Sequence, residues 1–362
     1  MTERVASRPL GGGRRRVVRS SASRRNPGRS GALRVLMITS EWPEPGSARP
    51  TQFIRRQAEF LKAAGVELDV FAFRGGKKPW NYLKAWSRVR PRLRSGQYDL
   101  VHAQFGQSGL LAFPRQLPLV VTFRGCDLLG TFGDRLGRPT ARGRLLQTFS
   151  RFVARRADAV IIVSEHMRRQ FKTRAPVHVI PSGLDLKLFR PYPQREARQE
   201  LGLDQEARLV LFVASPRDTR KRYGLAKRAV ELLNERLPAK LIVGWGIPHE
   251  KIPLYMSAAN VLVVTSIEEG SPNVVKEALA CNLPVVSVAV GDVPERLKGV
   301  AGTEVCADDR PQTIASALER VLRRRERVDG RSAVRSLDEH LLTRRVIDIY
   351  RSVIRRSKGS CA

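Results

Sequence analysis

Cysteine, histidine and long apolar runs are scarce in this sequence of 362 residues. The four cysteines lie far apart without a C-x-x-C spacing, which argues against a disulfide framework or a zinc site and favours a reducing compartment. The five histidines form no cluster, and no D-x-D or H-E-x-x-H motif is present, so we expect no metal site. Because no run approaches about 18 apolar residues and residues 1–30 lack an apolar signal segment, we expect neither a transmembrane helix nor a secretory leader.

Acidic residues are also few, with 34 Asp and Glu against 66 Lys and Arg and a formal net charge of +32. Residues 1–30 hold nine Arg and one Glu, residues 31–190 hold 28 basic and 11 acidic side chains, and the remainder holds 29 and 22. Such charge is informative about partners rather than fold, and it suits nucleic acid, an anionic membrane or a phosphorylated substrate. Aromatics make up only 6%, and no RNP, KH, zinc-finger or helix-turn-helix pattern is present, so we expect no specific nucleic-acid binding.

Short apolar runs alternate with helix-length segments along most of the chain. Ten runs predict buried parallel strands, at residues 34–40, 66–73, 100–104, 119–123, 159–164, 177–182, 208–215, 240–246, 261–266 and 284–290. Because the alternation occurs twice, with a change of texture near 190–205, we predict two doubly wound α/β domains. Residues 1–30 are rich in Arg, Ser and Gly and are expected to be disordered.

The most informative segment begins at the predicted strand 261–266. A glycine loop follows this strand, and a helix is predicted with Ser271 as N-cap and Pro272 at its first position. The free amide groups of the next residues would then point at an anion, and these residues are Asn273, Val274 and Val275. Glu269 in the loop and Glu277 in the helix suit a ligand site, but their spacing alone equally suits a capped helix with two solvated glutamates.

The order of these motifs resembles the retaining family-4 glycosyltransferases of the GT-B fold, over most of residues 34–355. The resemblance rests on E-G-x-P-x-V-V-x-E-A-x-A after the strand, followed by G-D-V-P-E at 291–295. Residues 157–185 are similar to the family's end-of-first-domain signature, and residues 212–233 to the basic turn that opens its second domain. The resemblance implies two Rossmann-like domains that face each other across a cleft, with a C-terminal helix returning to the first.

The resemblance also sets the expected domain boundaries. We expect a disordered basic tail at residues 1–32 and an acceptor-side Rossmann-like domain at residues 33–190. A nucleotide-sugar-binding Rossmann-like domain is expected at residues 191–335, and residues 336–362 are expected to form a helix that packs on the first domain.

Residues of the donor site follow from the same resemblance. It implies that Glu277 binds the donor ribose, that Glu269 lies near the transferred hexose, and that Lys221 binds the diphosphate. Further donor contacts are implied for Gly270, Gly244 and the amides of Asn273, Val274 and Val275. The family usually places an Arg five or six residues before this Lys. Here Arg217 is our choice for that role, with Arg220 as the other candidate.

On the acceptor side the chain departs from the family pattern. The segment 120–127 resembles the family's T-x-H-G-x-D motif, but Arg124 replaces the usual His. Because an Arg stays protonated, it can bind an anion but cannot act as a general base. Asp127 is expected to orient Arg124 or to contact the acceptor, and His102 is expected to be structural. The resemblance places an acceptor and phosphate loop at Gly46, Ser47 and Thr51.

The activity implied is transfer of a hexose-type sugar from a nucleoside diphosphate-sugar to an acceptor hydroxyl. The donor is a substrate, and no metal or other cofactor is expected. Two alternatives stay open at this point, namely a nucleotide-sugar epimerase on the same fold and a basic nucleic-acid-binding protein.

Two basic segments of the first half suggest a further partner. Residues 77–94 combine seven basic and no acidic residues with Trp80, Tyr82 and Trp86, although Pro91 is expected to interrupt a helix there. Residues 135–156 hold seven Arg and no acidic residue. This composition suits peripheral contact with anionic lipid, and equally a solvated Arg-rich face. We therefore expect a cytoplasmic protein, at the inner face of the cell membrane if lipid binds; the acceptor stays open.

Overall fold

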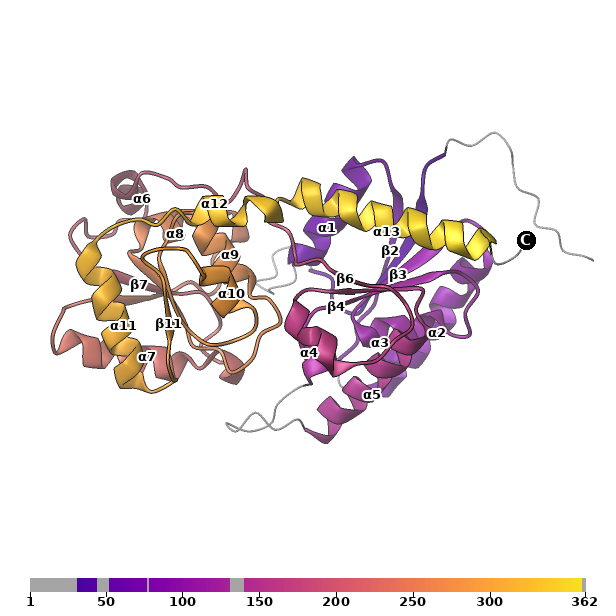
Figure 1. Ribbon diagram of the computed structural model, residues 1–362, viewed down its shortest axis with the longest axis horizontal. Helices are drawn as coiled ribbons and strands as arrows, with labels where there is room; N and C mark the ends of the chain where they lie inside the picture. The colour runs from indigo at the N-terminus through magenta and orange to yellow at the C-terminus, as the bar shows by residue number, and fades with distance from the viewer. Residues whose placement is uncertain (1–30, 44–51, 77, 131–139, 360–362) are drawn as a thin grey trace, which may run out of the picture. The chain divides into compact units, whose positions relative to one another are not determined.

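The computed structural model describes residues 31–43, 52–76, 78–130 and 140–359, and these residues form two parallel sheets (Figure 1). The first has the order β2-β1-β3-β4-β5-β6, built from β1 (Arg34–Thr39), β2 (Glu67–Ala72), β3 (Leu100–Gln104), β4 (Leu119–Phe123), β5 (Ala159–Ile162) and β6 (Val177–Val179). The second has the order β11-β10-β9-β7-β8, built from β7 (Leu209–Phe212), β8 (Lys240–Val243), β9 (Val261–Val264), β10 (Val285–Val288) and β11 (Glu304–Cys306). All ten predicted runs form strands, and β11 was not predicted.

Helices connect these strands. The helices are α1 (Gln52–Ala63), α2 (Pro79–Arg94), α3 (Gly106–Gly109), α4 (Cys126–Leu129), α5 (Ala141–Arg156), α6 (Gln194–Glu200), α7 (Tyr223–Asn234), α8 (Ile252–Ala258), α9 (Asn273–Ala280), α10 (Val293–Leu297), α11 (Pro311–Arg324), α12 (Gly330–Val334) and α13 (Glu339–Gly359). Short 3-10 segments are η1 (Leu110–Ala112), η2 (Glu165–Gln170), η3 (Thr219–Lys221), η4 (His249–Lys251) and η5 (Arg335–Leu337). The expectation that Pro91 interrupts a helix was wrong, since α2 runs through it.

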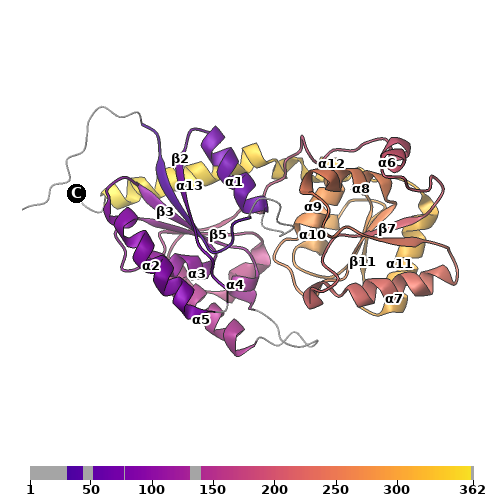
Figure 2. The same cartoon turned by 180° about the vertical axis from the view of Figure 1, so that it is seen from behind.

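The first sheet is buried on both faces because alternate side chains of each strand point to opposite sides. Leu36 and Ile38 of β1 pack on the side of α2 and α5, whereas Val35 and Met37 pack on the side of α1 and α13. Figures 1 and 2 show α13 beside α1, on the face of the sheet opposite to α2 and α5. The last helix in the sequence therefore completes the core around the first strand.

The second sheet has one continuous core. Its central strands β7, β9 and β10 are fully buried four-residue segments, and helices cover both faces, with α7 and α11 on one side and α8 and α9 on the other (Figure 1). Because all strands are parallel, their carboxyl ends lie at one edge, where open α/β sheets bind ligands. In the residues that the structure describes, no helix is both long and apolar enough to cross a bilayer.

Candidate functional site

An ion pair joins the carboxyl ends of two adjacent strands of the second sheet. Lys221 ends η3, which follows β7, and its Nζ contacts Oε1 of Glu269 in the loop after β9. Both side chains are partly buried, with 26% and 17% of their surface exposed. The geometry places a cation and a carboxylate together at the ligand-binding edge of the sheet.

The backbone around Lys221 is fixed to the end of β9. The hydroxyl of Thr265 donates to the carbonyl oxygen of Lys221 at 2.8 Å, and the amide of Ile267 donates to the carbonyl of Arg220 at 2.9 Å. Arg222 has a left-handed backbone with φ of 51° and donates from Nε to the carbonyl of Thr265 at 2.6 Å. These bonds hold Lys221 in place before any ligand binds.

Helix α9 begins one residue later than predicted. Its N-cap is Pro272 rather than Ser271, whose hydroxyl donates instead to the carboxylate of Asp292 at 2.8 Å. The amide of Val275 donates to the carbonyl of Pro272 at 3.3 Å, so the expectation that it is free was wrong. In the described part of the chain the amides of Asn273 and Val274 have no acceptor, and these two amides can bind an anion.

Gly270 lies where two loops from different sheets meet. A β-carbon at this position would lie 2.5 Å from the carbonyl oxygen of Arg124 and 3.1 Å from a methyl group of Val163. Gly291, with φ of +57°, packs on the same loop, and a β-carbon there would lie 2.9 Å from the carbonyl oxygen of Glu269. The glycines permit a backbone contact that any side chain would block.

Two further glutamates lie close in sequence to Gly270, Glu268 in the same loop and Glu277 in helix α9. Glu277 on α9 is 7% exposed, and its carboxylate has no hydrogen-bond or ion-pair partner among the described residues. Burial and the neighbouring Glu269 carboxylate raise the pKa of Glu268 to about 7, against the opposing effect of Arg220. Glu268 was not predicted as a site residue, because its raised pKa results from burial, which the spacing of residues in the sequence does not reveal.

The other predicted donor residues lie at the same edge. Arg217, before η3, is exposed, and its guanidinium has no partner in the part of the chain that the structure describes. Gly244 follows β8 and donates from its amide to the carbonyl of Phe212 at 2.8 Å. The structure therefore gathers Arg217, Lys221, Gly244 and Glu269 at the carboxyl ends of β7, β8 and β9.

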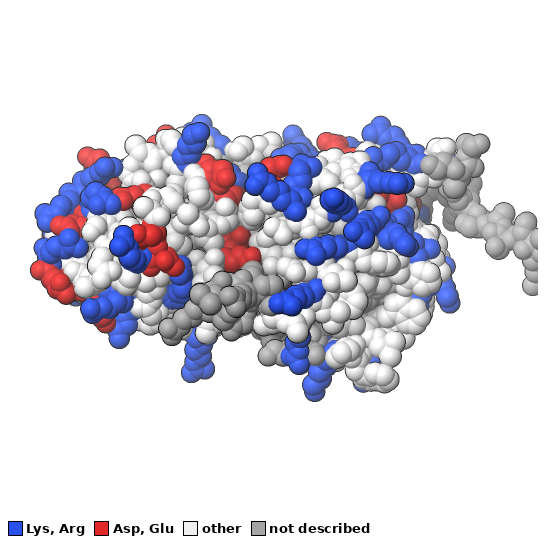
Figure 3. Space-filling model, turned by 60° about the horizontal axis from the view of Figure 1, so that its bottom comes forward, with Lys and Arg blue, Asp and Glu red and all other residues white. Residues whose placement is uncertain are grey.

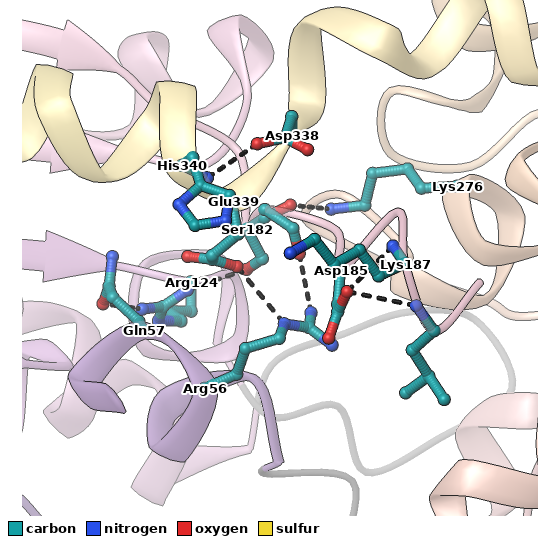
Figure 4. Close-up of polar contacts among 12 residues, drawn as sticks. Arg56, Gln57, Arg124, Ser182, Asp185, Lys187, Lys276, Asp338, Glu339 and His340 are labelled. Carbon is teal, nitrogen blue, oxygen red and sulfur yellow. Dashed lines mark hydrogen bonds and ion pairs between the residues drawn. The ribbon is translucent and has the colours of Figure 1, made fainter. Parts of the chain in front are cut away.

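Arg124 follows β4 of the first sheet, in the part of the chain that we call the first half (residues 31–190). Its side chain is hydrogen-bonded to uncharged side chains. Its guanidinium donates to the side-chain oxygen of Gln104 at 2.7 Å, to that of Gln57 at 2.9 Å and to the hydroxyl of Ser182 at 2.7 Å. It also lies 4.7 Å from the ring centroid of Phe53. Burial lowers the pKa of Arg124 to about 10, so the side chain stays protonated at neutral pH. Figure 4 shows Gln57 and Ser182 around it.

Asp127 and His102 are buried residues that fix the backbone and side chains around Arg124. The Asp127 carboxylate is fully buried and accepts from the amides of Arg124 at 3.1 Å, Gly125 at 3.0 Å and Gly106 at 3.2 Å. In this structure it orients the loop and has no exposed surface, and its contact with an acceptor stays a prediction. His102 is bonded between Tyr350 and Thr122 at 2.6 and 2.7 Å, and burial lowers its pKa to about 3, as expected of a structural residue.

A buried lysine of the second half reaches the segment that leaves the first sheet. Lys276 on α9 has no exposed surface, and its Nζ donates to the carbonyl of Ser182 at 3.0 Å. Burial lowers the pKa of Lys276 to about 7. Because the hydroxyl of Ser182 accepts from Arg124, this one residue joins the Arg124 loop to the helix that carries Glu277 (Figure 4).

The two chain segments that connect the sheets lie side by side. Leu184 and Asp338 form a parallel β-bridge, with the amide of Leu184 bonded to the carbonyl of Leu337 at 2.8 Å. Arg56 of α1 contacts both segments, donating to the carbonyl of Gly183 at 2.6 Å and pairing with the buried carboxylate of Glu339 at 3.2 Å (Figure 4). Arg56 therefore clamps the outgoing and returning segments together.

Several residues of this site were not predicted. Lys276 had a signal, since a charged residue between the apolar residues Val274, Val275 and Ala278 of α9 must be either exposed or specifically paired. Arg56 and Glu339 had none, because they are 283 residues apart. The predicted acceptor loop at Gly46, Ser47 and Thr51 lies outside the described residues. Among the described residues, no three His, Cys, Asp or Glu side chains are grouped so that they could hold a metal ion.

Comparison with protein families gives two matches in tandem. Residues 33–188 match the model of Glycosyltransferase Family 4, and residues 203–324 match that of Glycosyl transferases group 1. The two matches correspond to the first and second sheets with their helices.

Individual proteins agree with this result. The chain is 29% identical to a D-inositol 3-phosphate glycosyltransferase of Mycobacterium marinum over 290 residues, which are 68% of this chain and 60% of that protein. The chain thus spans about three fifths of the length of that curated relative.

Solved structures show the same fold. Sucrose-phosphate synthase from Thermosynechococcus elongatus superposes with a TM-score of 0.75 at 20% identity, covering 90% of this chain and 100% of that one. Anabaena HepE in complex with UDP and glucose superposes with a TM-score of 0.65 at 17% identity, covering 88% and 100%. The predicted fold class, GT-B, is confirmed, and the chain belongs with the glycosyltransferases whose two models match it in tandem, Glycosyltransferase Family 4 over residues 33–188 and Glycosyl transferases group 1 over residues 203–324.

Proposed function

We propose that this chain is a retaining glycosyltransferase that moves a hexose-type sugar from a nucleoside diphosphate-sugar to an acceptor hydroxyl. The observation that carries the proposal is the ion pair of Lys221 and Glu269, held at adjacent strand ends beside the first turn of α9. A fixed cation stabilises the negative charge that develops on a departing diphosphate. A neighbouring carboxylate accepts hydrogen bonds from sugar hydroxyls. The tandem matches to Glycosyltransferase Family 4 and Glycosyl transferases group 1 support the same reaction class.

In this proposal the donor binds along the carboxyl ends of β7, β8 and β9. The unpartnered carboxylate of Glu277 accepts hydrogen bonds from the ribose, and Gly244 adjoins the base. The diphosphate binds Lys221, Arg217 and the free amides of α9, with Gly270 keeping the loop close. Because a solved neighbour carries UDP and glucose, a UDP-sugar is the first donor to test.

The mechanism proposed uses the donor's own phosphate as base. Lys221 leaves Glu269 for the incoming diphosphate, which frees the Glu269 carboxylate to bind the hexose. The acceptor oxygen then attacks the anomeric carbon on the face that the diphosphate leaves. The bond from that carbon to the phosphate oxygen breaks, and the diphosphate takes the acceptor proton. In this scheme Arg124 binds the sugar or its acceptor as a cation, and neither a metal ion nor a cofactor takes part.

The test begins with a thermal-shift screen of UDP-, GDP- and ADP-sugars, followed by turnover of the labelled donor. Glu269→Ala and Lys221→Ala should each lower kcat about 10²–10³-fold, as loss of a charge-stabilising group does in other enzymes. Lys227→Ala on α7, in an exposed pair with Glu231, is the matched control and should keep full activity. Near-normal turnover of both site variants would refute the proposal. A labelled product that is an isomeric nucleotide-sugar, formed without acceptor, would identify an epimerase instead.

A further inference from the structure

Two helices of the first half expose an unusual number of large apolar side chains. Trp80, Leu83 and Trp86 on α2 are 63%, 50% and 37% exposed. On α5, Leu145, Phe149 and Phe152 are 54%, 38% and 40% exposed. Elsewhere in the described chain only Trp245 and Leu341 are large apolar residues that are comparably exposed. We call the six residues of α2 and α5 the aromatic face.

The aromatic face is continuous across the two helices. Trp86 donates from its indole nitrogen to the carbonyl of Phe113 at 2.7 Å, and the ring of Phe113 packs on Phe152 with centroids 5.2 Å apart. Phe113 therefore joins the α2 stripe to the α5 stripe. The core is packed by other side chains of these helices, including Val89 and Val153, so the aromatic face is not needed to complete it.

Basic side chains surround the aromatic face, and neither helix contains an acidic residue. The exposed basic residues are Lys84, Arg88, Arg92 and Arg94 on α2, and Arg142, Arg144, Arg151, Arg155 and Arg156 on α5, whereas Arg90 on α2 is buried. Two arginines lie over aromatic rings, the buried Arg90 at 5.4 Å from Trp86 and the exposed Arg156 at 5.2 Å from Phe152. Figure 3 shows Lys and Arg gathered with few acidic side chains on the right side of the view, whereas both signs are mixed on the left.

We propose that the aromatic face docks on the surface of a bilayer that contains anionic phospholipid. Exposed Trp, Phe and Leu side chains enter the boundary between headgroups and acyl chains, and the surrounding arginines bind lipid phosphates. A nucleic acid would satisfy the charge but would leave Leu83 and Leu145 in water. An apolar patch with a basic rim has both features that an anionic membrane recognises. The inference does not depend on the sugar or the nucleotide of the reaction.

The experiment is co-sedimentation of the full chain with vesicles of phosphatidylcholine, alone or mixed with phosphatidylglycerol. The chain should bind the mixed vesicles, and a Trp80→Ser, Trp86→Ser, Phe149→Ser variant should bind at least about tenfold more weakly. Replacing Arg88 and Arg144 by Ser should weaken binding roughly fivefold for each charge. Trp245→Ser and Arg324→Ser in the second half are the matched controls and should bind like the parent.

Tryptophan fluorescence gives a second readout, because Trp80 and Trp86 should shift to the blue on vesicles and be quenched by brominated acyl chains. Equal binding by the triple variant and the parent would overturn the proposal and point to another part of the chain. Sedimentation velocity without lipid tests a second copy as the occupant. A dimer that the triple variant abolishes, with vesicle binding unchanged, would also overturn it.

Discussion

The Nζ of Lys276 lies 3.0 Å from the carbonyl oxygen of Ser182, although the lysine has no exposed surface. A buried ammonium with one hydrogen-bond acceptor is costly, which is why burial lowers the pKa of Lys276 to about 7. The contact links helix α9, which packs on the second sheet, to the segment that leaves the first sheet.

This contact predicts a pH dependence of stability. Because the folded pKa is below the unfolded value, the unfolded chain holds more protons between pH 7 and about 10. Stability should therefore rise with pH across this window, by up to about 1.4 kcal/mol per unit. Lys276→Met should remove this slope in denaturant unfolding. An unchanged slope in the variant would contradict the assignment.

Loss of the Arg56 clamp should be strongly destabilising. Arg56→Ala leaves the buried Glu339 carboxylate unpaired and should cost about 3 kcal/mol of unfolding free energy. The neighbouring Arg55→Ala is the matched control, because Arg55 forms an exposed pair with Glu59 and should cost less than about 1 kcal/mol. Glu339→Gln in the Arg56→Ala background should restore part of the loss. Equal costs for the two arginine variants would show that the clamp contributes little.

Gly270→Ala tests the contact between the two loops. Its β-carbon would meet the Arg124 carbonyl at 2.5 Å, so the loops must separate and stability should fall by about 1–3 kcal/mol. If the proposed reaction is correct, kcat should fall as well, because Glu269 is the preceding residue. Gly224→Ala on α7, where no atom lies within 4 Å, should leave both stability and turnover intact. A harmless Gly270→Ala would mean that the loops are not in close contact.

Glu268 should make stability fall as pH rises. Its folded pKa of about 7 exceeds the unfolded value of 4.5, so the folded chain holds more protons between these pH values. Above pH 7 the charged carboxylate is penalised by burial and by Glu269. Glu268→Gln should therefore be more stable than the parent at pH 8, by about 1–2 kcal/mol after solvent screening, and equal to it near pH 4. Thermal unfolding at the two pH values measures this difference.

The strands were predictable because each is a local apolar run, and the central strands β3, β4, β5, β7, β9 and β10 are buried on both faces. Strand β11 escaped because Glu304–Cys306 has three residues, of which only Cys306 is buried. The start of α9 was misplaced because Ser271, a good N-cap by composition, is bonded to Asp292, 21 residues away. Local rules cannot anticipate such a competing partner.

Site residues were also predictable only where a local motif marks them, and not where the contact joins distant parts of the sequence. Glu269 and Lys221 were found from motifs, and the ion pair between them follows from adjacent parallel strands. The surroundings of Arg124 could not be found, since Gln57, Gln104 and Ser182 come from three separate elements and have no common spacing. Because the partners of Arg124 are uncharged amides and a hydroxyl, the sequence contains no pairing of opposite charges that would point to them.

The position of α13 has a consequence for synthesis on the ribosome. This helix supplies Leu342, Val346 and Tyr350 to the core around β1, yet it is translated after the whole second sheet. The part of this apolar face that α1 does not cover therefore stays exposed while roughly 150 residues of the second half emerge, and during that time it is open to chaperones and to aggregation. Expression of the first half by itself would make that exposure permanent.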